Sequence, residues 1–224
     1  MNFFMTYEDG AAAFTPFGLV RLVVLCAAAF CVILILLNRQ KKSISAKQLA
    51  FAGIAIAIAY ICSGIRLFRM PWGGSVTLLS MFFVSVVGYW FGPRIGFMAA
   101  FTYGILQFIQ GGSTYVLSFW QVAFDYLFAF TALGVSGFFR SQKYGLQKGY
   151  IAGILLRGLF HSIGGYLYWM EYMPENFPAS LTAVYPVLYN YAYIRAEAAI
   201  TLAVISLPPV VQGLRTINKM ARGQ

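Results

Sequence analysis

Long apolar runs restrict the fold of this chain more than any other feature. They are about 17–25 residues long, the length of a helix that crosses a lipid bilayer, and short polar connections separate them. Of the 224 residues, 60% are hydrophobic and only 10% are charged, whereas a soluble domain carries roughly 25% charged residues. Because lipid offers the backbone no hydrogen-bond partners, such runs are stable there as helices. We therefore expect an all-α integral membrane protein.

Seven membrane-spanning helices are predicted from these runs. Their expected ranges are 17–38, 47–66, 76–91, 95–111, 119–139, 149–171 and 187–209. The polar segment 39–46 separates the first helix from the others, so the first looks like an addition to a six-helix bundle. The expected organisation is an extra helix with a basic linker at 1–46, a six-helix membrane domain at 47–214 and a basic cytoplasmic tail at 215–224.

The positive charges predict how the chain is oriented in the membrane. The net charge is +10, but the positive residues gather in short loops, so we expect no binding of nucleic acid. Successive connections between membrane helices lie on opposite sides of the membrane. Those on one side hold Arg39, Lys41, Lys42, Lys47, Arg94, Arg140, Lys143, Lys148, Arg215, Lys219 and Arg222, whereas those on the other side hold Arg66 and Arg69. Positive loops favour the cytoplasmic side. This predicts a multi-pass protein of the cell membrane with its N-terminus outside and its C-terminus in the cytoplasm.

Asp125 stands inside an apolar run, in the stretch SFWQVAFDYLFAF. A carboxylate at the centre of a membrane helix costs about 2.5–3.5 kcal/mol on insertion scales, and no Lys or Arg lies within a helical turn of it. An acid inside the membrane is by default a candidate functional group. At 1.5 Å per residue, Asp125 lies roughly 9 Å below the outer boundary of its helix. We expect its charge partner to arrive as a ligand.

Other polar and aromatic residues are expected near the same depth. The helix at 149–171 places Arg157, His161, Gly165 and Trp169 at every fourth position, and hence on one face. Tyr185 and Asn190 open the last helix, which also carries the stripe Tyr189, Tyr193 and Glu197, while Trp72, Tyr115 and Trp120 stand in outer connections. An acid below an aromatic rim suits an organic cation, because each cation–π contact contributes about 0.5–2 kcal/mol. No residue spacing typical of a metal site occurs, so we expect neither a metal nor a cofactor.

Structural roles are the alternatives for several of these residues. Trp and Tyr rings also mark the membrane interfaces of any helical bundle. His161 could be a packed, hydrogen-bonded core residue. Arg157 and Arg195 could pair with Asp125 or Glu197 as part of the scaffold.

Two further functions can be weighed on the sequence. The segment Gly134-Val135-Ser136-Gly137 resembles the GxSG segment of intramembrane serine proteases. We expect no enzyme, however, because Ser136 and His161 are predicted to lie roughly 10 Å apart along the membrane normal, too far for a nucleophile and its base. The alternative is that these small residues let helices approach closely. The chain has no GxxxxGK[ST] phosphate loop, so an ATP-driven system would need its ATPase on another chain, and a solitary proton-coupled transporter stays open.

Several stretches together resemble one family. They are LFRMPWGGSVTLLSMFFVSVVGYWFGPRIGFMAAFTYGILQFIQGG, QVAFDYLFAFTALGVSGFF, RGLFHSIGGYLYW and YPVLYNYAY. In this order and spacing they are similar to the thiamine-specific substrate-binding (S) component of energy-coupling factor (ECF) transporters, over about residues 47–210. The resemblance implies a six-helix fold that binds thiamine near the outer face. It also implies docking to a membrane coupling protein and two cytoplasmic ATPases, which alone use ATP.

The resemblance further implies which residues bind the ligand. The family's ligand contacts fall on the pair Asp125 and Tyr126, on His161, Gly165 and Trp169, on Tyr185 and Asn190, on the basic residue Arg157, on Trp72 of an outer loop and on Tyr115 before the acid. This chain departs from the family in two ways. Asp125 stands where the family has Glu, which shortens the reach of the carboxylate, and the extra N-terminal helix has no counterpart.

The coupling surface of such S components is a pattern of small residues on the first core helix. AFAGIAIAIA supplies Gly53 and Ala57, or alternatively Ala55 and Ala59, and packing within the bundle is the other use of such residues. The sequence thus predicts a thiamine-binding subunit of an ECF-type importer. The open alternatives are an S component for phosphorylated thiamine, a precursor, another vitamin or another organic cation, and a solitary transporter.

Overall fold

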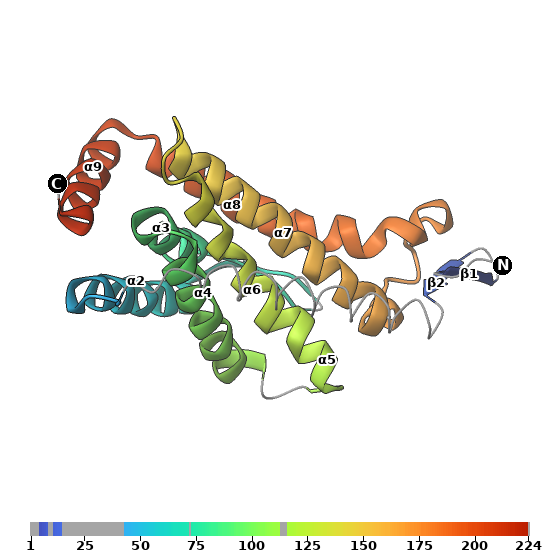
Figure 1. Cartoon of the computed structure of the whole chain (residues 1–224). Helices are drawn as coiled ribbons and strands as arrows, with labels where there is room; N and C mark the ends of the chain where they lie inside the picture. The colour runs from blue at the N-terminus through green and yellow to red at the C-terminus, as the bar shows by residue number, and fades with distance from the viewer. Residues whose placement is uncertain (1–4, 9–10, 15–42, 72, 113–115, 224) are drawn as a thin grey trace.

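The computed structural model describes residues 5–8, 11–14, 43–71, 73–112 and 116–223. In these residues, six long helical segments form a bundle, and a further helix follows at the C-terminal end (Figure 1). Near the N-terminus, β1 (Met5–Glu8) and β2 (Ala11–Phe14) pair as an antiparallel hairpin. The predicted extra helix at 17–38 lies outside the described residues.

The six helical segments follow the order of the six predicted core helices. They are α2 (Ala46–Gly64), α3 (Ser80–Phe91), α4 (Pro93–Gln107) with its π-helical end η1 (Phe108–Gly112), the continuous segment 119–139, α7 (Gly145–Tyr168) and α8 (Tyr185–Ile205). Two 3-10 turns, η4 (Met170–Tyr172) and η5 (Ala179–Val184), connect α7 with α8. The predicted all-helical, six-helix bundle is confirmed.

The segment 119–139 changes its hydrogen-bonding pattern along its length. It runs from α5 (Phe119–Val122) through the π-helical η2 (Ala123–Phe128) and α6 (Ala129–Thr131) to the 3-10 helix η3 (Ala132–Phe139). Ser118 caps its start by accepting a hydrogen bond from the Gln121 amide. The π-helical turn carries Asp125, and such turns are frequent at functional sites.

Two helices of the described residues, Ala46–Gly64 and Phe119–Phe139, are long and apolar enough to cross a bilayer. Ser80–Phe91 is apolar but short, and the helical segment Ala179–Ile205, which includes α8, qualifies only together with the bent helix Pro208–Arg222 that follows it. Arg157 and Glu197 lower the hydropathy of α7 and α8, yet both side chains are buried inside the bundle. These two charged side chains therefore face protein.

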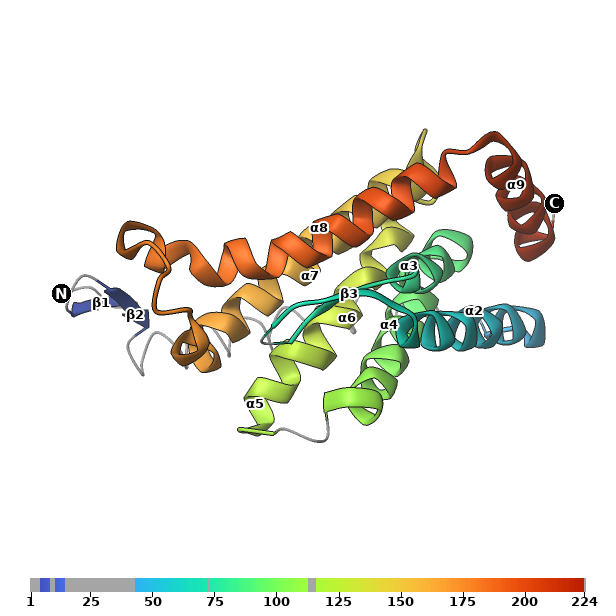
Figure 2. The ribbon, with the colours of Figure 1, turned by 180° about the vertical axis from the view of Figure 1, so that it is seen from behind.

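The predicted helix at 76–91 begins later than expected. Two strands, β3 (Arg66–Arg69) and β4 (Ser75–Thr77), pair as an antiparallel hairpin, and the helix starts only at Ser80. Gly73 and Gly74 form the turn with φ angles of 102° and 80°, a region that favours glycine. Val76 and Thr77 are β-branched and therefore favour a strand. The hairpin lies across the bundle beside α8 (Figure 2).

Glycines bring α3, α4, η3 and α7 into close contact where α3 turns into α4. A Cβ atom added to Gly96 would lie 2.6 Å from Cα of Gly88, and one added to Gly137 would lie 2.3 Å from N of Pro93. Small residues of this kind let helix backbones approach closely. This end of the bundle is consequently a tight, backbone-to-backbone crossing.

Ser136 belongs to the same crossing. Its hydroxyl donates a hydrogen bond of 2.5 Å to the carbonyl of Ser85, and its side chain is fully buried. A Cβ atom on Gly149 of α7 would lie 2.8 Å from Cα of Ser136. The segment 134–137 thus packs helices together, as the non-catalytic alternative predicted.

The last predicted helix, at 187–209, ends early and a separate helix follows it. α8 ends at Ile205, and α9 (Pro208–Arg222) turns away by 85°. Pro208 and Pro209 stand at the start of α9, because proline is tolerated in the first turn of a helix but cannot continue a preceding one. The residues expected as a basic tail continue this helix. The Arg222 guanidinium donates hydrogen bonds to the carbonyls of Tyr89, at 2.7 Å, and Arg140, at 3.2 Å, which tie α9 to the end of α3.

We expect Gly137→Ala to destabilise the protein, because the new methyl group would overlap the backbone of Gly92 and Pro93. Overpacking of this kind costs about 1–3 kcal/mol, measurable as a lower melting temperature of the detergent-purified protein. Gly53→Ala is the matched control, since no atom lies within 4 Å of its added Cβ and alanine favours a helix over glycine. Equal melting temperatures for the two variants would contradict the tight crossing.

Candidate ligand-binding site

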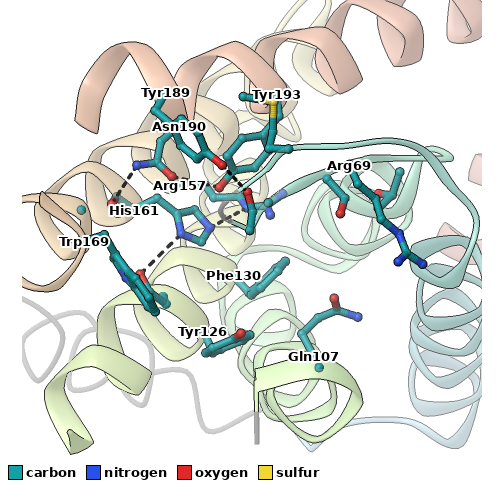
Figure 3. Close-up of a pocket in the computed structure, with 18 of the residues that line it drawn as sticks. Arg69, Gln107, Tyr126, Phe130, Arg157, His161, Trp169, Tyr189, Asn190 and Tyr193 are labelled. Carbon is teal, nitrogen blue, oxygen red and sulfur yellow. Dashed lines mark hydrogen bonds and ion pairs between the residues drawn. The ribbon is translucent and has the colours of Figure 1, made fainter. Parts of the chain in front are cut away.

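A pocket of about 600 Å³ opens at one end of the bundle (Figure 3). Its walls come from the end of α2, the β3–β4 hairpin, the end of α4, η2, the second half of α7 and the start of α8. This volume is within the range of small-molecule sites. The tight glycine crossing lies at the opposite end of the same helices.

The structure brings eight of the predicted site residues to this pocket. They are Asp125, Tyr126, Arg157, His161, Gly165, Trp169, Tyr185 and Asn190. Trp72 and Tyr115 lie outside the described residues. Gly53 and Ala57, which were predicted for coupling to a partner, lie on the exposed side of α2, away from the pocket.

Two neutral donors hold the carboxylate of Asp125. Gln121 Nε2 donates to Asp125 Oδ2 at 2.8 Å, and Trp169 Nε1 donates to the same oxygen at 2.9 Å. The other oxygen, Oδ1, lies 3.8 Å from His161 Nδ1. The expectation that the charge partner of Asp125 arrives as a ligand stays a prediction. The protein supplies hydrogen bonds, which stabilise the carboxylate, but the described Lys and Arg side chains form no ion pair with it.

His161 lies between Asp125 and Arg157. Arg157 donates its Nε–H to His161 Nε2 at 3.3 Å, which makes Nε2 the acceptor and assigns the ring proton to Nδ1, facing Asp125. Arg157 is only 7% exposed, and its guanidinium lies 4.4 Å from the centre of the Phe130 ring. The scaffold alternative of a direct ion pair from Arg157 to Asp125 or Glu197 is wrong in the described structure, because its partners are His161 and Phe130.

Tyrosines of α8 form an aromatic wall along the pocket. The ring centres of Tyr185 and Tyr189 are 5.7 Å apart, and those of Tyr189 and Tyr193 are 6.4 Å apart. The Tyr193 hydroxyl donates to Asn190 Oδ1 at 3.0 Å, while Asn190 Nδ2 donates to the carbonyl of His161 at 3.2 Å. This network fixes the amide and connects α8 to α7 at the level of the acid.

Two consecutive glycines let α7 fit between η2 and α8. A Cβ atom on Gly164 would lie 2.6 Å from Asp125 Oδ1, and one on Gly165 would lie 2.8 Å from Cβ of Pro186. Gly165 thus allows α8 to approach α7 closely, and it also lines the pocket. The position of the Asp125 carboxylate thus depends on the missing side chain of Gly164.

Residues outside the predicted set complete the pocket. They include Ser63, Arg66, Arg69, Gln107, Gln110, Gln121, Phe130, Tyr189 and Tyr193. Tyr189 and Tyr193 belong to a stripe that is visible in the sequence, and Gln121 precedes Asp125 by four residues, the spacing of neighbours on a helix. No pattern in the sequence distinguishes Gln107 and Gln110 from ordinary polar residues at a helix end.

Glu197 holds the hairpin that forms one wall of the pocket. Its Oε2 accepts hydrogen bonds from the Thr77 amide at 2.9 Å and the Thr77 hydroxyl at 2.6 Å. Its Oε1 accepts from the Ser80 hydroxyl and the Met81 amide, each at 3.2 Å. The residue before α3 provides no side-chain cap, so this glutamate from α8 serves as the cap. It joins the hairpin, α3 and α8.

Three comparisons relate the chain to known proteins. The family model described as "Thiamine transporter protein" matches residues 49–216. The thiamine transporter ThiT of Bacillus subtilis (strain 168) is 28% identical to the chain over 184 residues, which cover 76% of this chain and 93% of the relative. A solved structure of ThiT from Listeria monocytogenes resembles the fold with a TM-score of 0.57 at 22% identity, covering 72% of this chain and 94% of that one.

We expect Glu197→Ala to loosen the pocket wall, because it leaves the partly buried Thr77 amide, the buried Met81 amide and two hydroxyl groups without their acceptor. The loss of stability should reach at least about 2 kcal/mol, and hydrogen exchange at residues 75–81 should accelerate. Glu197→Gln retains one acceptor oxygen at nearly the same volume and should have an intermediate effect. Unchanged exchange in the alanine variant would show that the hairpin does not depend on Glu197.

Proposed function

The chain belongs to the thiamine transporter protein family, and from this membership we propose that it is the thiamine-binding membrane subunit of an ECF-type vitamin importer. In this proposal it binds thiamine at the extracellular face of a bacterial cell membrane. A separate membrane coupling protein with two cytoplasmic ATPases then drives delivery to the cytoplasm. The chain itself performs no covalent chemistry and uses no cofactor.

The observation that carries the proposal is the placement of Asp125 in a pocket with aromatic walls. Trp169 and Gln121 stabilise its carboxylate with neutral hydrogen bonds and leave its negative charge in place. Thiamine contains a permanently cationic thiazolium ring, which can compensate this charge at low hydration cost. The rings of Trp169, Tyr126 and the α8 tyrosines then supply flat contacts and cation–π attraction.

The second ring of thiamine, an aminopyrimidine, requires hydrogen bonds in a defined geometry. Asn190 and His161 stand beside the acid in a fixed arrangement, since Tyr193 binds Asn190 and Arg157 binds His161. In this proposal they contact the pyrimidine directly or keep its binding surface in shape. Arg157 acts through His161, because its guanidinium is buried against Phe130.

The orientation in the membrane follows from the distribution of positive charge. Arg94, Arg140, Lys143 and Lys148 stand at the end of the bundle opposite to the pocket, together with α9. Positive residues favour the cytoplasmic side, so the pocket faces outward. The small residues Gly53 and Ala57 lie on the exposed side of α2, where a coupling protein can approach closely.

A solitary proton-coupled transporter is the second candidate, and the row of Arg157, His161 and Asp125 favours it, because rows of ionisable groups in membranes can relay protons. The two candidates differ in what the chain does alone. Vesicles that contain only this chain should bind thiamine but not accumulate it under a pH gradient if the importer proposal holds. Accumulation driven by the gradient alone would favour the second candidate.

We expect micromolar thiamine to quench the tryptophan fluorescence of the detergent-purified protein, and Asp125→Asn to weaken this binding by at least about 1–2 kcal/mol, because a desolvated charge pair is lost. Glu171→Gln removes the charge of an exposed carboxylate outside the pocket lining and should leave the affinity unchanged. If the unsubstituted protein shows no quenching, thiamine is not its ligand. If Asp125→Asn binds as tightly as the unsubstituted protein, the acid does not face the cation.

For the coupling surface, we expect Gly53→Leu with Ala57→Leu to retain thiamine binding but to lose energised uptake, because the added side chains would keep the partner backbone at a distance. Uptake in cells that supply the coupling module, with co-purification of that module, measures the effect. Ala59→Leu is the informative contrast, since Ala59 is fully buried and its substitution should lower stability instead. Normal uptake by the double variant would exclude this face of α2 as the docking surface.

A further inference from the structure

The C-terminal helix α9 has an apolar flank that its contact with the bundle leaves exposed. Leu214 and Ala221 face the bundle, where Ala221 is only 4% exposed and Leu214 packs against the buried core. Ile217 and Met220 are apolar as well, but they are 38% and 53% exposed. The apolar arc of α9 is therefore wider than the surface by which the helix packs on the bundle.

Basic residues occupy the other flank of α9. Arg215 and Lys219 are four residues apart, so they share a face of the helix, and both are exposed. At about 100° per residue, Ile217 lies roughly 160° around the helix from each of them. Leu214, which faces the bundle, lies between these two flanks. A helix with an apolar flank and a basic flank on nearly opposite sides suits the boundary between lipid and water.

The direction of α9 agrees with such a position. It meets α8 at 85°, at the end of the bundle away from the pocket (Figure 1). Arg222 holds it there, because its guanidinium donates to the carbonyls of Tyr89 and Arg140 and lies 4.5 Å from the centre of the Tyr89 ring. A helix at right angles to one that crosses the membrane runs along the membrane surface.

The charges around α9 are positive and have no acid beside them in the part of the chain that the structure describes. Lys47 belongs to this group, because a Cβ atom on Gly223 would lie 3.9 Å from Lys47 Nζ. Arg140 belongs to it through the hydrogen bond from Arg222. The described acidic residues lie elsewhere in the fold and are Glu8, Asp125, Glu171, Glu175 and Glu197. This end of the protein therefore attracts anions.

We propose that α9 lies along the membrane surface at the end opposite to the pocket and binds anionic phospholipid. Ile217 and Met220 enter the layer of acyl chains, while Arg215 and Lys219 contact the phosphate groups. Long basic side chains can reach head groups while their stems cover apolar surface. Each Lys or Arg near an anionic membrane surface strengthens binding by about fivefold.

Lipid fits α9 better than an acidic protein surface does. An acidic protein would compensate the basic flank but would leave the apolar flank, on nearly the opposite side of the helix, in contact with water. An anionic bilayer offers acyl chains to one flank and phosphate groups to the other. The inference goes beyond the proposed function and does not depend on which ligand the pocket holds.

Hydrogen exchange of the full-length protein in nanodiscs tests this inference. One type of nanodisc contains phosphatidylcholine alone, and the other contains phosphatidylcholine mixed with anionic phosphatidylglycerol. We expect the backbone amides of residues 210–222 to exchange about 5–30-fold more slowly in the anionic nanodiscs, because the helix must leave the charged surface before it opens. Added salt should reduce this difference. Both leaflets of a nanodisc have the same composition, so the orientation of the chain does not affect the result.

Three variants test the basic flank. Arg215→Gln with Lys219→Gln should reduce the difference between the two nanodisc types to less than about twofold, because the attraction to anionic lipid is lost. Arg215→Lys with Lys219→Arg keeps both charges and should retain the difference. Arg66→Gln with Arg69→Gln removes two positive charges at the opposite end of the bundle and should also retain it.

The apolar flank requires a separate variant. Ile217→Ser with Met220→Ser should speed exchange of α9 at least about tenfold in both nanodisc types, because burial of these side chains among acyl chains does not depend on head-group charge. Gln212→Ser with Thr216→Ser, at exposed polar positions, controls for helix propensity and should change exchange by less than about threefold. Unchanged exchange in α7 shows that each variant keeps its bundle.

Equal exchange of α9 in the two nanodisc types would overturn the inference. A lipid dependence that survives Arg215→Gln with Lys219→Gln would overturn it as well. If anionic lipid has no effect and only a purified coupling module slows exchange, α9 is a protein-docking surface and the inference is wrong. Failure of the protein to bind thiamine would overturn the proposed function and leave this inference intact.

Discussion

A carboxylate within a membrane bundle must be surrounded by hydrogen-bond donors, and this requirement organises the pocket. Two buried or partly buried acids satisfy it differently. Glu197 uses both oxygens, each with two donors from the hairpin or the start of α3. Asp125 uses one oxygen for Gln121 and Trp169, while the other has only His161 at 3.8 Å. Glu197 is therefore a structural link, whereas Asp125 retains an oxygen and a charge for a ligand.

The two ends of the bundle have different roles: close helix packing stabilises one end, and the pocket lies at the other. At the closed end, the glycines of α3, α4 and η3 place backbone against backbone, so dispersion contacts between closely packed atoms hold the helices together. At the other end, α3 is short and the hairpin takes its place beside α8. The resulting space is lined by polar and aromatic groups from several elements. The solved structure of ThiT from Listeria monocytogenes is similar in fold over 72% of the chain.

The pocket is also divided across its width. Asp125, His161 and Trp169 line one side, which suits a cation held between aromatic rings. Arg66, Arg69 and two glutamines line the other side. The buried Arg157 belongs to the first side, where its charge is directed at His161 and Phe130.

The sequence by itself determined the helical bundle and much of the pocket. Placing a polar residue of an apolar run inside a bilayer costs free energy, so such residues stand out in the sequence as candidates for a function. Asp125 and His161 were identified in this way, and helical periodicity joined Trp169 to His161. Tertiary structure alone decided the partners of these groups. The β3–β4 hairpin depends on strand pairing, and the capping role of Glu197 depends on donors far away in the chain. Such contacts leave no periodic signal, because they form only when distant segments pack against each other.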